Sequence, residues 1–221
     1  MSNQEEVLHH QSSAGWVVLA SQIPRLGGDT PELAANLVER IDLSRPPVIL
    51  SVGEPPPGLK DLNGDLAALL SVEPILLEAT VDPPEELAEL SLIVLVGSDG
   101  ERWVDLLATS SLGDLLLKAL VQGGVVLAVD QAAAALGSWR MDPVLGTASE
   151  GLGWVSGAVI MPGETEPSKS AALRELLEEN PKAYALALAE HTLVALGPEN
   201  EIQVWGEAEP TIIFGPGWQQ S

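Results

Sequence analysis

The sequence predicts a single α/β domain, built as a three-layer α/β/α sandwich around a mostly parallel central sheet. Uninterrupted apolar runs lie at residues 16–20, 48–52, 92–96 and 125–129, as is typical of strands buried on both faces. Helical patterns separate these runs, and crossovers of that length connect parallel strands rather than antiparallel ones. A shorter strand is expected at residues 75–77.

The helices are expected between the strands. Thr30 and Pro31 provide an N-cap and a first-turn proline for a helix that runs to about residue 40. Further helices are expected at about 58–70, 112–121 and 168–179. The last third then carries short runs at 184–188, 192–196, 202–205 and 211–214, with a turn-like segment at 197–200. We interpret these runs as a C-terminal antiparallel hairpin extension that completes the same sheet or packs beside it.

Composition and charge exclude several classes of protein. The chain has 221 residues, 46% of them hydrophobic, a net charge of -22 and no cysteine. Disulfide and thiolate chemistry are therefore excluded, and nucleic acid and anionic membranes are not expected as partners. Residues 1–14, which include His9 and His10, are expected to form a flexible tail, and residues 15–221 the domain. The start lacks the pattern of a secretory signal, and a cytoplasmic protein is expected.

The segment most indicative of a functional site is GGVVLAVDQAAAALG, at residues 123–137. A buried strand ends at Val129, Asp130 and Gln131 follow, and a run of alanines begins a helix. A strand, a tight turn and a helix of small residues are typical of a nucleophile elbow, which lifts one side chain over the edge of a sheet. In doubly wound folds, ligands meet the loops at this carboxyl edge.

This segment resembles the GGVIAGTSAGAAVLG-type segment of cyanophycinase and alpha-aspartyl dipeptidase, which are serine peptidases with a class I glutamine amidotransferase-like, flavodoxin-like fold. Three further pieces match in order: LSLIVLVGSDGERWVDLL, read as a strand, a Gly-rich loop and a helix; GLGWVSGAVI, which includes another strand; and KAYALALAEHTLVALGPENEIQVWGEAEPTIIF. The resemblance covers roughly residues 91–214 and implies that fold for the chain.

The resemblance also implies where a catalytic site would lie, and there the sequence departs from the family. The nucleophilic serine falls on Asp130, and the catalytic histidine falls at about Gly163. The implied rim of the ancestral site consists of Gly97, Ser98, Asp99, Gly163, Glu164 and Glu190, with Gln131 beside the elbow position.

A serine–histidine mechanism needs a hydroxyl, a base within hydrogen-bond reach and a group that orients the base. The chain has three histidines, two of them in the tail, and His191 stands where the family has an acid. We therefore expect a non-catalytic homologue that acts as a binding or scaffold protein, with an unknown small ligand or protein partner, no cofactor and a homodimeric state. One alternative is a hydrolase with a remodelled, carboxylate-based site at Asp130. Another is an acidic protein-interaction module that docks through Trp139 or Trp154.

Several side chains also have simpler interpretations. Asp130 is interpreted first as a helix N-cap, since Asp is among the residues preferred there. His191 is interpreted as a polar residue at a strand edge, and the loop of Arg25 and residues 27–29 as the entry to a helix. Core packing is the first interpretation of each tryptophan near the elbow, Trp103 among them. The carboxylates of Asp99, Glu101, Asp130 and Glu164 would be the ligands of a site for a hard cation such as Mg²⁺ or Ca²⁺. We do not expect a metal at this position.

Overall fold

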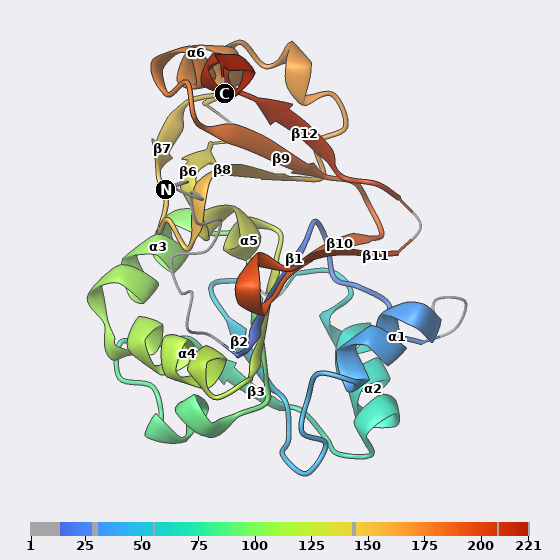
Figure 1. Cartoon of the computed structure of the whole chain (residues 1–221). Helices are drawn as coiled ribbons and strands as arrows, with labels where there is room; N and C mark the ends of the chain where they lie inside the picture. The colour runs from blue at the N-terminus through green and yellow to red at the C-terminus, as the bar shows by residue number, and fades with distance from the viewer. Residues whose placement is uncertain (1–13, 28–30, 55, 143–144, 207, 221) are drawn as a thin grey trace.

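The structure, a computed structural model, describes residues 14–27, 31–54, 56–142, 145–206 and 208–220. Its main element is a seven-stranded sheet in the order β11-β10-β1-β5-β4-β2-β3 (Figure 1). Five of these strands are parallel, and β10 and β11 are antiparallel additions at one side. The strands are β1 (Trp16–Ala20), β2 (Val48–Ser51), β3 (Ile75–Glu78), β4 (Leu92–Val96), β5 (Val125–Val129), β10 (Thr192–Leu196) and β11 (Ile202–Gly206).

Helices cover both faces of this sheet, which confirms the three-layer α/β/α sandwich. Helices α1 (Pro31–Val38) and α2 (Leu59–Leu70) lie on one face, and α3 (Gly100–Thr109) and α4 (Ser111–Val121) on the other (Figure 1). A 3₁₀ turn, η1 (Glu85–Glu89), packs beside α4. The helices form because their leucines recur every three or four residues; α2, for example, buries Leu59, Leu62, Leu66 and Leu70.

A second, five-stranded sheet follows in the order β12-β9-β8-β6-β7. Helix α6 (Ala171–Glu179) covers its outer face, and the short helix α5 (Gln131–Ala135) lies between the two sheets (Figure 1). Its strands are β6 (Gly137–Met141), β7 (Ala148–Glu150), β8 (Val155–Pro162), β9 (Tyr184–Leu188) and β12 (Thr211–Phe214), and the remaining 3₁₀ turns are η2 (Pro167–Lys169), η3 (Pro198–Asn200) and η4 (Pro216–Gln220).

The C-terminal strands form where the sequence predicts them, but they are divided between the two sheets. β10 and β11 extend the first sheet as an antiparallel hairpin, whereas β9 and β12 belong to the second. The physical reason is the burial of β9, which has apolar residues packed on both faces and pairs in parallel with β8. The connection between β9 and β10 therefore joins the two sheets.

One apolar cluster spans both sheets. It contains Val194 and Leu196 from β10 together with Leu186 and Leu188 from β9, and α5 fills the space between them. Among the described residues, no helix has the length and apolar character needed to cross a bilayer.

Candidate functional site

Asp130 occupies a strained backbone position between β5 and α5. Its φ of 53° and ψ of -122° lie in a region that non-glycine residues rarely adopt. Its N–H donates to the carbonyl of Ala20 at 2.9 Å, which fixes the turn to the end of β1. The alanines that follow, 132–135, are all buried, so α5 approaches the strands closely. The backbone of a nucleophile elbow is therefore present, as the sequence predicts, although its residue is an acid.

The side chain of Asp130 does not cap α5, so its interpretation as an N-cap is wrong. The carboxylate makes no capping hydrogen bond to α5. Its partner is instead Gln131, whose Nε2 lies 3.4 Å from Oδ1. Asp130 is partly buried, and this desolvation raises the pKa of its carboxyl, although hydrogen bonds with Gln131 oppose the shift. The carboxylate of Asp130 thus contacts the first residue of α5 without capping the helix.

The loop after β4 lies against the elbow. Gly97 has a φ of 143°, and a Cβ there would stand 2.4 Å from the carbonyl oxygen of Val52, so only glycine fits. Ser98 and Asp99 are exposed, and the Asp99 carboxylate accepts the N–H of Arg102 at 3.0 Å, which makes it the N-cap of α3. Gly100 then packs against Gln131, whose carbonyl oxygen would be 3.3 Å from an added Cβ.

The end of β1 lies beside Asp130. Ala20 pairs with Val129 in the parallel register, so Ser21 follows at the same edge of the sheet. Ser21 is 7% exposed, and its hydroxyl donates to the carbonyl of Ala189 at 2.9 Å. Reasoning from sequence missed this residue, although its place directly after a predicted strand was a usable signal. Its hydroxyl ties the first sheet to the β9–β10 connection.

The β9–β10 connection carries two candidate residues, His191 and Glu190. His191 is exposed with a φ of 61°, and its Nδ1 lies 3.2 Å from Nε2 of Gln22. The hydrogen bonds and ion pairs of the described residues include none between His191 and Asp130. Glu190 is exposed beside it. His9 and His10 lie outside the described residues.

Gly163 and Glu164 mark the end of β8. The N–H of Gly163 donates to the carbonyl of Leu188 at 2.9 Å, so this rim residue lies next to the β9–β10 connection. Glu164 turns to its own loop, where its Oε1 accepts the N–H of Glu166 at 2.8 Å. Within the described ranges, no three acidic or histidine side chains are arranged to hold a metal ion. The hard-cation site considered from the sequence is therefore not formed there.

Arg140 is a neighbour of the elbow that the sequence did not reveal. It belongs to β6, and its Cδ would be 2.9 Å from a Cβ placed on Gly100, the same residue that packs against Gln131. Its Nε is buried and has no hydrogen-bond partner within the described part of the chain. Arg140 therefore packs beside Gln131 at Gly100, and Gln131 in turn contacts the carboxylate of Asp130.

The tryptophans near the elbow are mainly structural. Trp103 is fully buried and Trp154 is 8% exposed, both in the cluster that spans the two sheets. Trp139 is partly buried and packs against the cluster under α6. Docking of a partner through Trp154 therefore has no exposed surface to use. Arg25 and Gly27 lie after β1, where Asp65 accepts the N–H of Gly27 at 3.1 Å; residues 28–29 fall outside the described residues.

Solved structures share this fold, whereas no protein-family model and no curated protein matches the sequence. A crystal structure of a peptidase from an acI-B1 Actinobacterium superposes with a TM-score of 0.69 and 21% identity, covering 93% of each chain. A Listeria monocytogenes EGD-e protein assigned as a peptidase E gives a TM-score of 0.59 and 12% identity, covering 88% of this chain and 99% of that one. The chain therefore has the fold of these peptidases, in agreement with the fold that the sequence resemblance implies.

Proposed function

We propose that this peptidase-fold protein does not hydrolyse peptide bonds and instead uses its elbow to bind a small zwitterionic ligand, such as a dipeptide. The observation that carries the proposal is the Asp130 carboxylate, which stands in the strained elbow conformation and makes no cap to α5. Strain of this kind costs on the order of 1–3 kcal/mol and persists where function maintains it. A carboxylate held there is suited to an ammonium or guanidinium group.

The chemistry of the site argues against serine-type hydrolysis. Asp130 has no hydroxyl to attack a carbonyl, and the ring of His191 contacts Gln22 rather than the elbow. The charge of Asp130 would also repel a developing oxyanion rather than stabilise it. These features support the proposal, because serine attack requires a hydroxyl and a base within hydrogen-bond reach of it.

The neighbours of Asp130 support binding of a ligand with both charges. The Gln131 amide lies 3.4 Å from the Asp130 carboxylate, and a Cβ on Gly100 would meet both Gln131 and the Cδ of Arg140, so Arg140 packs beside Gln131. A free amino or guanidinium group would pair with Asp130, and a ligand carboxylate would pair with Arg140.

The test is a turnover assay with β-aspartyl-arginine and Asp-X dipeptides. We expect no hydrolysis by the wild type, and the same baseline for Asp130→Ala. Cleavage by the wild type that disappears in Asp130→Ala would overturn the proposal. Asp130→Ser restores a hydroxyl at the elbow, but we expect it to stay inactive, because His191 remains bound to Gln22. The homodimer expected from the sequence stays a prediction, which sedimentation equilibrium tests.

One observation favours a second candidate, a hydrolase that uses Asp130 itself as the nucleophile. The side chain keeps the elbow conformation in which a nucleophile is lifted over the sheet edge. Attack by the carboxylate on an acyl carbon would form a mixed anhydride and release the amine. Hydroxylamine would convert that anhydride to a hydroxamate on Asp130, which mass spectrometry of the wild type detects; an unmodified Asp130 counts against this candidate.

A further inference from the structure

Strand β12 forms an open edge of the second sheet, and its outward backbone groups are unpaired among the described residues. β12 pairs only with β9, in a register that places Ile213 opposite Ala185. The N–H of Gly215 donates to the carbonyl of Ala183 at 2.8 Å, so alternate residues, 211, 213 and 215, exchange hydrogen bonds with β9. Ile212 and Phe214 therefore direct their N–H and C=O groups away from the sheet, toward solvent.

Apolar side chains surround this edge on both faces. Ile212 is 48% exposed and Phe214 53% exposed, and the ring of Phe214 lies 5.3 Å from that of Trp218. Ile213 lines a cavity of about 370 Å³ between β12 and α6, together with Leu173 and other residues of the helix, and Phe214 contributes to the same lining. Since side chains of a strand alternate between faces, an added strand would place its side chains over both of these surfaces.

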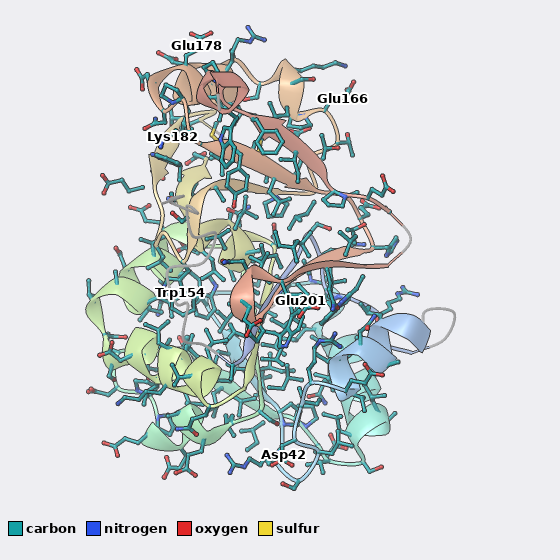
Figure 2. The ribbon with its side chains drawn as sticks, viewed as in Figure 1. Asp42, Trp154, Glu166, Glu178, Lys182 and Glu201 are labelled. Carbon is teal, nitrogen blue, oxygen red and sulfur yellow. The ribbon has the colours of Figure 1, made fainter. Side chains whose placement is uncertain are left out.

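The charge of this part of the chain specifies the kind of strand that fits. Residues 183–221 contain no lysine or arginine, although the exposed Lys182 directly precedes them, and Glu209 is their acid nearest to β12 in the chain. Glu209 is exposed just before β12, and Glu178 of α6 lines the cavity (labelled in Figure 2). One cation shares that cavity: Arg174, whose Nη2 lies 3.5 Å from the carbonyl of Ser168. A second copy of the chain would bring acid against acid, whereas a basic segment is complementary.

We propose that β12 accepts an extended segment of a basic partner protein as an additional strand, with lysine or arginine alternating with apolar residues. Main-chain hydrogen bonds to Ile212 and Phe214 would set the register. The apolar side chains of the partner would enter the cavity beside Ile213, and its cations would pair with Glu178 and Glu209. This surface shares no residue with the elbow, so the two proposals fail independently.

The test uses three peptides: KVKVKVK as the probe, KGKSKGK with the same charge but no apolar side chains, and EVEVEVE with the opposite charge. The key variant is Ile212→Pro, which removes an outward N–H that the sheet does not use. The matched control is Val204→Pro in β11, an edge strand of the other sheet. Val204 is 46% exposed. The N–H of Gly197 donates to the carbonyl of Glu201, so residues 201, 203 and 205 exchange hydrogen bonds with β10, and the N–H of Val204 is directed outward.

We expect KVKVKVK to bind the wild type and the Val204→Pro and Asp130→Ala variants with equal affinity. Its affinity for Ile212→Pro should be lower by about tenfold or more, because one hydrogen bond at the edge and its neighbours are lost. We also expect weak binding of KGKSKGK and none of EVEVEVE. Amide exchange on the wild type gives a second readout that needs no variant: KVKVKVK should slow exchange at Ile212 and Phe214.

Three results would overturn the proposal. Equal binding of KVKVKVK and KGKSKGK would show attraction by net charge alone. Unchanged exchange at Ile212 and Phe214 in saturated complex would place the peptide elsewhere. A wild-type dimer that Ile212→Pro converts to a monomer would assign the edge to a second copy of the chain.

Discussion

Replacing Asp130 with glycine should stabilise the fold while removing its elbow carboxylate. The φ of 53° and ψ of -122° are accessible to glycine without strain, and the strain of a non-glycine residue is on the order of 1–3 kcal/mol. Glycine also lowers the free energy of unfolding by roughly 0.4–1 kcal/mol, because it increases the conformational entropy of the unfolded chain. The substitution removes the contact from Gln131 Nε2 at 3.4 Å, but no capping hydrogen bond to α5. The net gain in the free energy of unfolding is therefore about 0.5–2 kcal/mol.

Asp99 provides the matched control, because it is an aspartate at a helix N-cap that does bond its helix. Its φ is -106°, and its carboxylate accepts the N–H of Arg102 at 3.0 Å. Asp99→Gly therefore gains no relief of strain and loses a cap, and the entropy of glycine adds to that loss. We expect a decrease of about 1 kcal/mol in the free energy of unfolding.

Thermal unfolding followed by circular dichroism measures both changes. For a domain of this length, 1 kcal/mol shifts the Tm by about 2–4 °C, so Asp130→Gly should melt higher than the wild type and Asp99→Gly lower. The opposite signs are the decisive feature of the comparison. If Asp130→Gly lowered the Tm as much as Asp99→Gly does, the carboxylate of Asp130 would be supporting the fold, and its assignment to ligand binding would be refuted.

Three further predictions concern single groups. Burial raises the pKa of Asp130, so the fold is less stable when this carboxyl is ionised, and stability is lost as pH rises through the folded pKa. The Tm of Asp130→Asn minus the Tm of the wild type should therefore grow as pH rises from acid to neutral. A difference that shrinks would contradict this prediction. In urea titrations, Gly97→Ala should lower the free energy of unfolding by more than about 2 kcal/mol, because the added Cβ would meet the carbonyl of Val52. Gly163→Ala, which has open space around the added Cβ, should lower it by only about 1 kcal/mol. Equal losses in the two variants would refute the steric argument. Burial raises the pKa of Tyr184, the one tyrosine of the chain, to about 12. Absorbance at 295 nm should therefore titrate near that value in the folded protein and near the ordinary value of about 10 in urea. A midpoint near 10 in the folded protein would show that the hydroxyl is exposed.

Sequence patterns predicted the first sheet because its parallel strands are buried on both faces. A strand such as β4 or β5 must then be apolar at every position, and such runs are visible without any knowledge of the fold. The elbow was located by the same logic, since the strand ends abruptly at Asp130 and small residues follow. The resemblance to serine peptidases implies that the loops at Gly97 and Gly163 border the same site, and this stays a prediction.

The second sheet was harder to predict because its strands β6 and β7 are short and partly polar. Ser138 and Arg140 alternate with apolar residues in β6, and β7 is exposed throughout, so neither gives an uninterrupted apolar run. Arg140 was therefore not expected beside the elbow. The direction of the Asp130 side chain was also missed, because it depends on a left-handed backbone that the residue type does not reveal.

Saturation-transfer NMR of β-aspartyl-arginine with the purified protein tests in one sample whether the elbow binds a zwitterionic ligand and whether it cleaves that ligand. We expect transfer to the intact dipeptide by the wild type, loss of transfer in Asp130→Ala, and no appearance of free arginine. Free arginine that accumulates with the wild type and not with Asp130→Ala would contradict the proposal, as would transfer that is the same for both proteins.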